Sequence, residues 1–589
     1  MMPTLPLPLP MTQAEARARG WEELDVVLVG GDAYVDHPSF GIALVGRVLE
    51  AAGYRVGIIA QPDWRSTQDF TALGRPRLFA GVTAGNMDSL VSNRTAEKRR
   101  RRSDAYSPGG VPGRRPDRAT IVYANRVAEA YPGLPIVLGG VEASLRRISH
   151  YDYWEDTVRR SLLADAMADL LVYGMGERAV VEIARRLAAG EPVRALRDIL
   201  GTAYRCAPGQ EPEGATWLPD HEAAASDPEA FIRLHRLAVE QARGSGRVLA
   251  QRAGKWSVVV NPPAPPLAEQ ELDALSALPC SRRAHPAYAA PVPALETVQF
   301  SITSHRGCFG GCAFCALYAH QGRTVQSRSV ASIVQEAREL AAHPDFRGVI
   351  LDVGGPTANS YGLGCREGRD REGCPRPSCL WPQVCSRLET SHARQLAMLR
   401  RVAQVPGVKR VFVASGVRFD LALQDGEYVR ELARHYVGGH LKIAPEHFAA
   451  GVLRLMRKPG AECYLAFNRA FRKHSEEVRR EQYVVPYLMA GHPGCRMADM
   501  EETAAFMRAH GIRVEQVQSF TPIPMTDATC MWHTGRDPGS GKPVYVARDP
   551  QERAAQLALL QQAGYGKGGS VPRKTTSKQR RTGPRSKNL

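Results

Sequence analysis

The chain of 589 residues lacks any apolar run approaching the roughly 20 residues that a membrane-spanning helix needs. Its first 20 residues are rich in proline and lack the basic segment and long apolar stretch of a secretory signal peptide. Cysteine is scarce as well, because 12 cysteines in a chain of this length are too few for a disulfide scaffold. These absences predict a cytoplasmic protein that has no membrane partner.

The cysteines that are present are distributed unevenly, since seven of the 12 lie between Cys308 and Cys385. In a reducing compartment, clustered thiols are more often metal ligands or catalytic groups than halves of disulfides. A metal or redox centre is therefore expected in this part of the chain.

Acidic residues are outnumbered, because 77 Lys and Arg stand against 60 Asp and Glu, a net charge of +17. Eight basic residues and no acidic residue lie in the tail 566–589, and a second basic cluster spans residues 98–102. Such charge favours RNA or another nucleic acid as a partner. A solvated tail and a charged loop would explain it equally well. The tail has almost no apolar residue to bury, so we expect it to be disordered.

Residues 21–190 show five short apolar runs that alternate with helical patterns. Continuous apolar runs joined by crossovers are typical of a parallel sheet that is covered on both faces. This region is therefore expected to be an α/β domain with a Rossmann-like parallel sheet, preceded by the Pro-rich leader 1–20. The runs are 26–29, 56–59, 78–82, 136–138 and 170–173.

The segment 191–297 carries weaker signals, and we expect it to be a helical and linker segment. From residue 298 to residue 530, strand candidates alternate with amphipathic segments, which predicts a partial (β/α)6 barrel. A Cys-rich insertion, 360–390, interrupts this barrel, and a C-terminal extension, 531–565, follows it. The six strand candidates are 299–303, 348–353, 410–414, 440–444, 482–489 and 514–520.

Three cysteines with C-x-x-x-C-x-x-C spacing, Cys308, Cys312 and Cys315, follow the first of these strand candidates. Their loop contains three glycines, which permit the close backbone approach that wrapping around a cubane cluster requires. Three thiolates leave one iron open for chemistry, whereas a structural zinc site usually has four protein ligands. We therefore interpret this loop as a 4Fe–4S site; the alternatives are a zinc knuckle and three unrelated core cysteines.

This motif resembles the signature of the radical S-adenosylmethionine (SAM) superfamily. In that superfamily, SAM chelates the fourth iron of the 4Fe–4S cluster, and one-electron reduction yields a 5′-deoxyadenosyl radical. The resemblance implies a 4Fe–4S cluster and SAM as cofactors, and an electron donor such as flavodoxin or ferredoxin as a partner. No catalytic residue beyond the cluster ligands is assigned. The residues that match the superfamily's cofactor-binding elements are Phe314, Gly354, Gly355, Thr357, Ser415, Arg418 and Glu446.

One of these elements departs from the superfamily's pattern. Pro356 stands where the Gly-Gly-Glu element has its glutamate, so the contact to the cofactor's amino group would fall to backbone carbonyls and Thr357.

The chain from about residue 21 to residue 535 resembles the YgiQ-type radical SAM family. That resemblance gives the chemistry but leaves the substrate open. The strings that carry it lie at residues 31–41, 81–89, 142–147, 308–315, 441–447 and 516–524.

The N-terminal region resembles the cobalamin-binding Rossmann-like domain that precedes many radical SAM barrels. Gly139-Gly140 and the segment 174–178 match that pattern. The Asp-x-His-x-x-Gly motif that supplies a lower ligand is absent, because Asp36 and His37 are adjacent. A Rossmann-like layer with no ligand, or one with a substrate role, is therefore as consistent with the sequence as cobalamin binding.

Four further cysteines lie in the insertion: Cys365, Cys374, Cys379 and Cys385. Their spacing fits no standard zinc pattern, but an apolar-poor segment often needs a metal to fold. An auxiliary iron–sulfur cluster, a structural zinc and unligated thiols are the alternatives.

Radical chemistry on RNA, protein or another substrate is the function that these features favour. The alternatives are a nucleic-acid-binding protein with structural or redox metal clusters, and an electron-transfer or regulatory iron–sulfur protein. The first alternative does not explain the glycine-rich loop after a barrel strand, and the second requires four cysteines in that loop.

Overall fold

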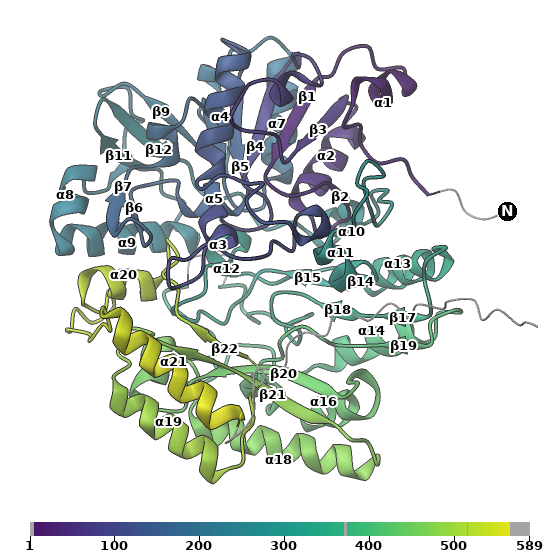
Figure 1. The fold of residues 1–589 in the computed structure, drawn as a ribbon, viewed down its shortest axis with the longest axis vertical. Helices are drawn as coiled ribbons and strands as arrows, with labels where there is room; N and C mark the ends of the chain where they lie inside the picture. The colour runs from purple at the N-terminus through teal and green to yellow at the C-terminus, as the bar shows by residue number, and fades with distance from the viewer. Residues whose placement is uncertain (1–4, 370–373, 515, 566–589) are drawn as a thin grey trace, which may run out of the picture.

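The computed structural model describes residues 5–369, 374–514 and 516–565. Figure 1 shows two α/β halves stacked one above the other, the N-terminal half in purple to blue and the C-terminal half in green to yellow. Residues 370–373 of the insertion and the tail 566–589 lie outside the described residues, so the predicted disorder of the tail stays a prediction.

Nine strands form the sheet of the N-terminal half, in the order β10-β11-β12-β9-β8-β5-β4-β1-β3. The last five in this order are parallel to one another and coincide with the five predicted apolar runs. The predicted Rossmann-like parallel sheet is therefore confirmed. These five strands are β1 (Val26–Gly30), β3 (Val56–Ala60), β4 (Phe79–Thr83), β5 (Ile136–Gly139) and β8 (Leu170–Val172).

Helices cover both faces of this parallel part. Alternate side chains of β1 enter two separate apolar cores, because successive residues of a strand point to opposite faces. One core includes residues of α4 (Ala119–Ala130), and the other includes residues of α2 (Gly41–Ala51) and α7 (Glu177–Ala188). With both faces covered, the carboxyl ends of the strands remain as the edge where a ligand can bind.

The segment 191–297 is more than the expected helical and linker segment, because it contributes four strands to the same sheet. β9 pairs antiparallel with both β8 and β12, and β12 pairs antiparallel with β11. The expected helix is present as α9 (Pro228–Ala242). The added strands are β9 (Thr202–Cys206), β10 (Thr216–Trp217), β11 (Leu249–Ala253) and β12 (Trp256–Val260).

The C-terminal half is an open barrel of six parallel positions that follow chain order. β14 pairs with β18, β17 with β19, β20 with β21, and β21 with β22, all in parallel. A parallel bridge between Val417 and Ile443 joins the third position to the fourth. This topology confirms the partial (β/α)6 barrel. Its strands are β14 (Ser301–Thr303), the broken pair β17 (Val349–Ile350) and β18 (Asp352–Gly354), β19 (Arg410–Val411), β20 (His440–Glu446), β21 (Tyr483–Ala490) and β22 (Gln516–Ser519).

Amphipathic helices connect the barrel strands and bury their apolar sides against them. The connecting helices include α13 (Val330–Ala342), α14 (Ala393–Ala403), α18 (Ala461–Glu477) and α19 (Met497–Ala509).

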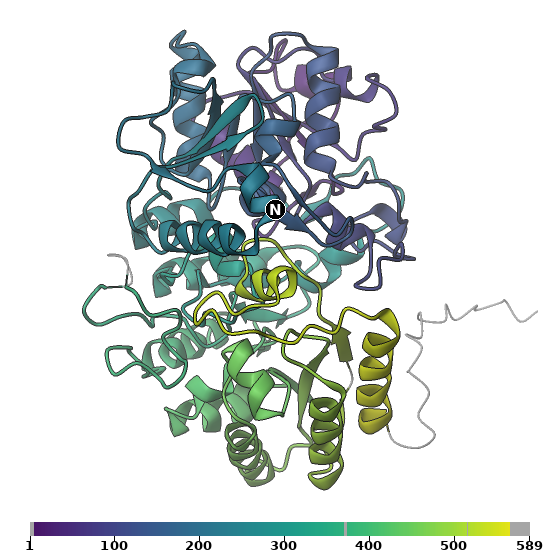
Figure 2. The ribbon, with the colours of Figure 1, turned by 90° about the vertical axis from the view of Figure 1, so that its left-hand side faces the viewer.

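Two further helices complete the C-terminal half. α21 (Pro550–Tyr565) packs against α19 and the last barrel strands, whereas α20 (Asp527–Thr534) packs against α9 of the N-terminal half. Figures 1 and 2 show α20 at the junction of the two halves. Among the described helices, none combines the length and the apolar character that crossing a bilayer demands.

Candidate functional site

The cysteine loop begins after the short strand β15 (His305–Arg306) and is shaped by glycines with positive φ. Gly307 has φ 80° and Gly311 has φ 62°. A Cβ at Gly307 would lie 2.1 Å from the Thr324 carbonyl oxygen, and one at Gly311 would lie 2.2 Å from the Pro377 carbonyl oxygen. The loop is therefore pressed between the segment that follows it and the Cys-rich insertion.

The three thiols have different surroundings. The Sγ of Cys308 lies 3.4 Å from Thr357 Oγ1 and accepts from the Gly310 amide at 3.4 Å, while the Sγ of Cys312 accepts from Arg418 Nη1 at 3.2 Å. Burial raises the pKa of the Cys315 thiol to about 12. This thiol stays protonated at neutral pH until a metal replaces the proton.

Basic side chains surround the loop. Besides Arg418, Arg457 contacts the loop, because its Nη1 donates to the Gly311 carbonyl at 3.4 Å. The buried Lys458 is close enough for its positive charge to offset part of the rise in the pKa of Cys315. A cluster held by three thiolates carries net negative charge, so these cations suit it. Within the described residues, no three His, Cys, Asp or Glu side chains converge on a single-ion site. A cubane does not require this, because each thiolate holds a different iron.

The insertion packs directly on the cysteine loop. The amide of Cys379 donates to the Phe309 carbonyl at 3.1 Å, and the Ser378 hydroxyl donates to the Gly310 carbonyl at 2.6 Å. Cys379 and Cys385 also pack against a small apolar cluster that contains Phe309. These contacts tie the insertion to the loop, and the auxiliary metal expected at Cys365, Cys374, Cys379 and Cys385 stays a prediction.

Two glycines at the end of β18, Gly354 and Gly355, leave no room for a side chain. A Cβ at Gly354 would lie 2.8 Å from Ser415 Oγ, and one at Gly355 would lie 2.7 Å from both Nε2 and the carbonyl oxygen of His305. His305 is fully buried and its Nε2 lies 2.9 Å from the Thr357 carbonyl oxygen. Burial lowers the pKa of His305 to about 4, so the ring is neutral at physiological pH. His305 thus holds in place the segment 354–357, which contains three of the predicted cofactor-binding residues.

Alanine at Gly355 is expected to lower the free energy of unfolding by about 1–3 kcal/mol, the usual cost of forcing a methyl group into a packed site. Gly416, in the loop after the neighbouring strand, has open space where its Cβ would stand. Gly416→Ala should therefore change stability little. Denaturant unfolding followed by circular dichroism compares the two variants, and equal stability would show that the contact with His305 relaxes without cost.

Two predicted cofactor residues are already engaged within the protein. The Ser415 hydroxyl donates to Asp352, whose other carboxylate oxygen accepts from the Ala414 amide at 2.7 Å. Arg418 forms a buried two-pronged ion pair with Asp420, in which Nε lies 2.9 Å from Oδ1. Burial by itself would raise the pKa of Asp420, but the guanidinium outweighs it and lowers that pKa below its ordinary value.

Glu446 is the predicted residue with an unsatisfied group. It has φ 70°, an uncommon value for a non-glycine residue, and its side chain is buried. Among the described residues, Glu446 Oε2 has no hydrogen-bond partner. Burial raises the pKa of Glu446, while Lys458 and Arg418 counter part of that rise. A strained backbone that holds an unpartnered buried oxygen is typical of a functional position.

Phe314 lies in the cysteine loop between the second and third cysteines. Its ring is half-buried and makes an edge contact with the ring of His492, at 6.1 Å between centroids. The remaining predicted residues divide into two groups. Thr357 and Arg418 contact the cysteines, whereas Gly354, Gly355 and Ser415 line a cavity.

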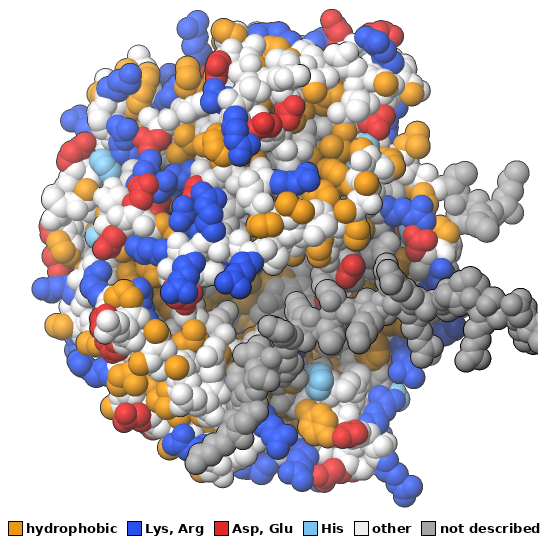
Figure 3. Space-filling model, in the orientation of Figure 1, with side chains coloured by type: hydrophobic (Ala, Val, Ile, Leu, Met, Phe, Trp, Pro, Cys, Tyr) orange, Lys and Arg blue, Asp and Glu red, His pale blue; other side chains and the backbone are white. Residues whose placement is uncertain are grey.

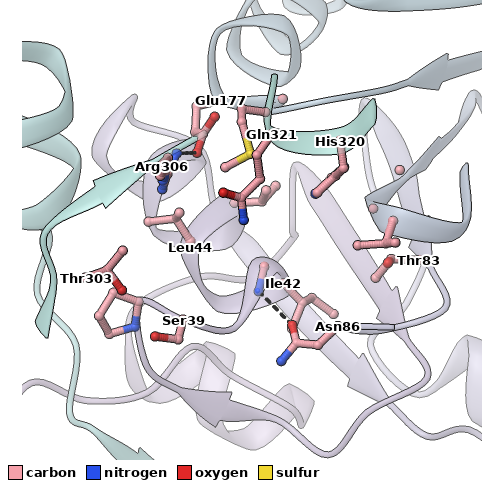
Figure 4. Close-up of a pocket in the computed structure, with 18 of the residues that line it drawn as sticks. Ser39, Ile42, Leu44, Thr83, Asn86, Glu177, Thr303, Arg306, His320 and Gln321 are labelled. Carbon is pink, nitrogen blue, oxygen red and sulfur yellow. Dashed lines mark hydrogen bonds and ion pairs between the residues drawn. The ribbon is translucent and has the colours of Figure 1, made fainter. Parts of the chain in front are cut away.

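This cavity, of about 770 Å³, lies between the two halves of the molecule (Figure 4). The carboxyl ends of the N-terminal parallel strands form one wall, and the barrel rim with the segment after Cys315 forms the other. Arg306 of the barrel donates to Glu177 of the N-terminal half at 2.6 Å, so an ion pair joins the two walls. The residues labelled in Figure 4 include Ser39, Ile42, Thr83 and Asn86 on the first wall and Thr303, His320 and Gln321 on the second.

Sequence reasoning did not identify His305, Asp420 or the pair of Glu177 and Arg306. Two local signals were available, since His305 lies three residues before Cys308 and Asp420 lies two residues after Arg418. The ion pair carried no such signal, because its partners are 129 residues apart.

The basic cluster at 98–102 is partly used within the fold. Lys98 Nζ donates to the Trp154 carbonyl at 3.2 Å, and Arg101 Nε donates to the Val91 carbonyl at 3.0 Å. On the face of the molecule that Figure 3 shows, basic side chains are spread out, with acidic side chains between them. The expectation of an RNA partner gains no support from this arrangement.

Comparison with protein families defines the class. A family model described as "Radical SAM N-terminal" matches residues 8–301, and one described as "Radical SAM superfamily" matches residues 302–507. A third, "Domain of unknown function (DUF3362)", matches residues 515–564. The chain is therefore a member of the radical SAM superfamily, as the cysteine loop and the six-stranded open barrel indicate.

Relatives narrow this class to a family. The chain is 50% identical to a UPF0313 protein of Methanosarcina mazei, over 92% of both chains. It is 53% identical to one of Geobacter sulfurreducens, over 92% of this chain and 90% of the other. With UPF0313 protein YgiQ of Escherichia coli it shares 44% identity, over 92% of this chain and 82% of the other. The chain belongs to the UPF0313 family, which confirms the resemblance to the YgiQ-type proteins.

Solved structures with a related fold are more distant. The radical SAM methyltransferase TsrM of Kitasatospora setae, with cobalamin and a [4Fe-4S] cluster bound, matches at a TM-score of 0.49 and 15% identity, over 86% of this chain and 76% of that one. The cobalamin-dependent SAM radical enzyme OxsB matches at a TM-score of 0.47 and 11% identity, over 86% of this chain and 54% of that one.

Proposed function

We propose that this protein is an enzyme that cleaves SAM reductively with a 4Fe–4S cluster held by Cys308, Cys312 and Cys315. The observation that carries the proposal is the glycine-shaped three-cysteine loop, which lies among basic side chains and whose flanking residues, Arg306 and Ala316, line the cavity between the two halves. When bound, the cluster supplies one electron to the sulfonium of SAM, which releases methionine and a 5′-deoxyadenosyl radical. The donor set and its charge fit such a cluster.

The residues of this chain would hold the cofactor in two ways. The strand end at Gly354 and Gly355 presents backbone groups to the cavity, kept in place by His305. Glu446 would offer its unpartnered oxygen to a cationic group, a role that Pro356 cannot fill because it has no carboxylate. Arg418, named above among the expected cofactor-binding residues, already donates from Nε and Nη2 to Asp420, so these two groups are not available to a cofactor carboxylate.

The N-terminal half would act as the cover of this site. Apolar side chains of α2, including Ile42 and Val45, line the cavity and limit the access of water. Exclusion of water protects a reactive radical from side reactions. Both ring nitrogens of His37 have hydrogen-bond partners, so any cobalamin in this half would bind without a ligand from His37.

Anaerobic reconstitution with iron and sulfide tests the proposal. We expect one 4Fe–4S cluster at the loop, and formation of 5′-deoxyadenosine when dithionite and SAM are added. A flavodoxin or ferredoxin should replace dithionite as the electron donor. A stable cluster that leaves SAM intact would contradict the proposal and favour an electron-transfer protein instead.

A further inference from the structure

A second, smaller pocket of about 110 Å³ lies behind the segment that follows the cysteine loop. One side is formed by residues 173–175, which follow β8, and by the proline-rich stretch 263–266. The other side is formed by residues 318–324, which include most of α12 (Leu317–Gln321). A water molecule occupies about 30 Å³ in the liquid, so this space equals the volume of about three to four waters, which suits a compact group.

Arg147 is the deepest side chain of this pocket, with 1% of its surface exposed. Its Nη1 donates to the Ser144 carbonyl at 2.6 Å, and its guanidinium lies 4.4 Å from the ring centroid of Tyr173. Within the described chain, the buried Nε has no hydrogen-bond partner, and no carboxylate forms an ion pair with this arginine. Burial lowers the pKa of Arg147, and only the phenols of Tyr173 and Tyr318 oppose that effect.

Other buried arginines of the described chain, unlike Arg147, have carboxylate partners. Arg115 pairs with Asp32 and Asp104, and Arg146 pairs with Asp88. A buried charge without a partner is costly, and natural proteins normally neutralise it. Arg147 is therefore a buried cation that the chain itself does not neutralise.

More positive charge lies at the same pocket. Arg243 and Arg323 both line it, and they donate to backbone carbonyls of the insertion, at Pro375 and at Cys374 and Arg376. Burial and the neighbouring Arg323 lower the pKa of Arg243. The nearby carboxylate, Asp527, is already held by His235 and Arg457.

Four arginines line the pocket, and none of the described residues that line it is Asp or Glu. The fourth, Arg178, is paired with Glu271. Like charges around a small space repel one another, and a bound anion offsets that repulsion. Guanidinium groups bind phosphate oxygens through parallel hydrogen bonds. We propose that this pocket binds a compact oxyanion, the phosphate group of a small ligand or free phosphate.

Hydrogen bonds connect the wall of this pocket to the cysteine loop. The Gly307 amide donates to Gln321 Oε1 at 3.2 Å, and the Cys308 amide donates to the Gly322 carbonyl at 3.2 Å. Both acceptors belong to the pocket wall, and Gln321 also lines the larger cavity. An anion bound there stabilises the segment that supports the first cluster cysteine. The binding itself does not depend on the proposed radical chemistry.

Isothermal titration of the reconstituted full-length protein, at constant ionic strength, tests the site with inorganic phosphate, ribose 5-phosphate and ribose. We expect both phosphates to bind and ribose not to bind. Arg147→Gln should weaken phosphate binding at least tenfold, because a hydrogen-bonded ion contact is lost. Arg243→Gln should weaken it as well and keeps the test decisive if Arg147→Gln folds poorly. Tighter binding of ribose 5-phosphate than of inorganic phosphate would identify an organic phosphate as the ligand, and the reverse would identify the free anion.

Arg205→Gln is the matched control. Arg205 also donates to backbone carbonyls and lies over an aromatic ring, at 4.9 Å from the centroid of Trp256, but it does not line the pocket. Its loss should leave phosphate affinity unchanged. No binding of either phosphate, or equal affinity in the Arg147→Gln, Arg243→Gln and Arg205→Gln variants, would overturn the proposal.

Discussion

Alanine at Cys308, Cys312 or Cys315 is expected to remove the 4Fe–4S cluster and with it all formation of 5′-deoxyadenosine from SAM. Each thiolate holds a different iron, so no neighbouring group can replace it. The rest of the loop should survive, because its shape comes from Gly307 and Gly311 and not from the cysteines. Iron and sulfide content, the absorption of the cluster and the yield of 5′-deoxyadenosine measure the loss.

Cys280→Ala is the control for this series. Cys280 is half-buried in the N-terminal half, beside Asp36 and Arg47, and burial raises the pKa of its thiol to about 12. We expect this variant to keep full iron content and full SAM cleavage. Wild-type iron and activity in each of the three loop variants would refute the cluster assignment. Iron or zinc that remains bound in all three variants after SAM cleavage is lost would instead indicate a metal at the auxiliary site predicted in the insertion.

Most of the fold was predictable because the relevant signals are local. The five parallel strands of the N-terminal half are continuous apolar runs, and such a run needs no distant partner to be recognised. β11 (Leu249–Ala253) was missed for the opposite reason. It contains Gln251, whose buried side chain accepts from the Ser149 amide and donates to the Pro219 carbonyl. Its polar residue looks exposed in the sequence, and only partners brought close by folding explain its burial.

The candidate site also combines features with a local sequence signal and contacts that form only when the chain folds. The cysteine spacing and the adjacent glycines lie within one loop, so the sequence was sufficient to find them. The contact between Arg418 and Cys312 joins residues 106 apart, and the sequence could not show that Asp420 holds this guanidinium. Arg147 lies within the string 142–147 that supported the family resemblance, but its lack of an acidic partner is a property of the folded chain.

Arg418→Ala is expected to lower the free energy of unfolding by about 3–5 kcal/mol, the usual cost of removing one partner of a buried ion pair. The reason is that Asp420 would remain buried without its guanidinium. Replacing both residues, as Arg418→Met with Asp420→Leu, should recover most of this loss, since no isolated charge is then left. Denaturant unfolding of the two variants and the wild type measures the difference.

The loss of unfolding free energy in Arg418→Ala is expected to become smaller as pH falls. In the wild type, the lowered pKa of Asp420 means that the pair stabilises the protein above the pKa of the unfolded carboxyl, about 3.9. That contribution is lost only as pH falls through the lower pKa of the folded state. In Arg418→Ala, burial without the guanidinium raises the pKa of Asp420, so the variant gains stability as its carboxyl is protonated. The gap between wild type and variant should therefore narrow as pH falls from 8 towards 5.

A redox measurement separates a role at the cluster from a purely structural one. Arg418 Nη1 donates to the Sγ of Cys312, so its positive charge stabilises the reduced cluster. Both the alanine variant and the double variant should shift the reduction potential to more negative values, and Arg418→Lys should shift it less because the charge is kept. Arg400→Ala, which breaks an ion pair with the buried Glu431 but does not contact the cysteine loop, should leave the potential unchanged. If the double variant regains stability and also keeps the wild-type potential, Arg418 supports the fold alone and does not tune the cluster.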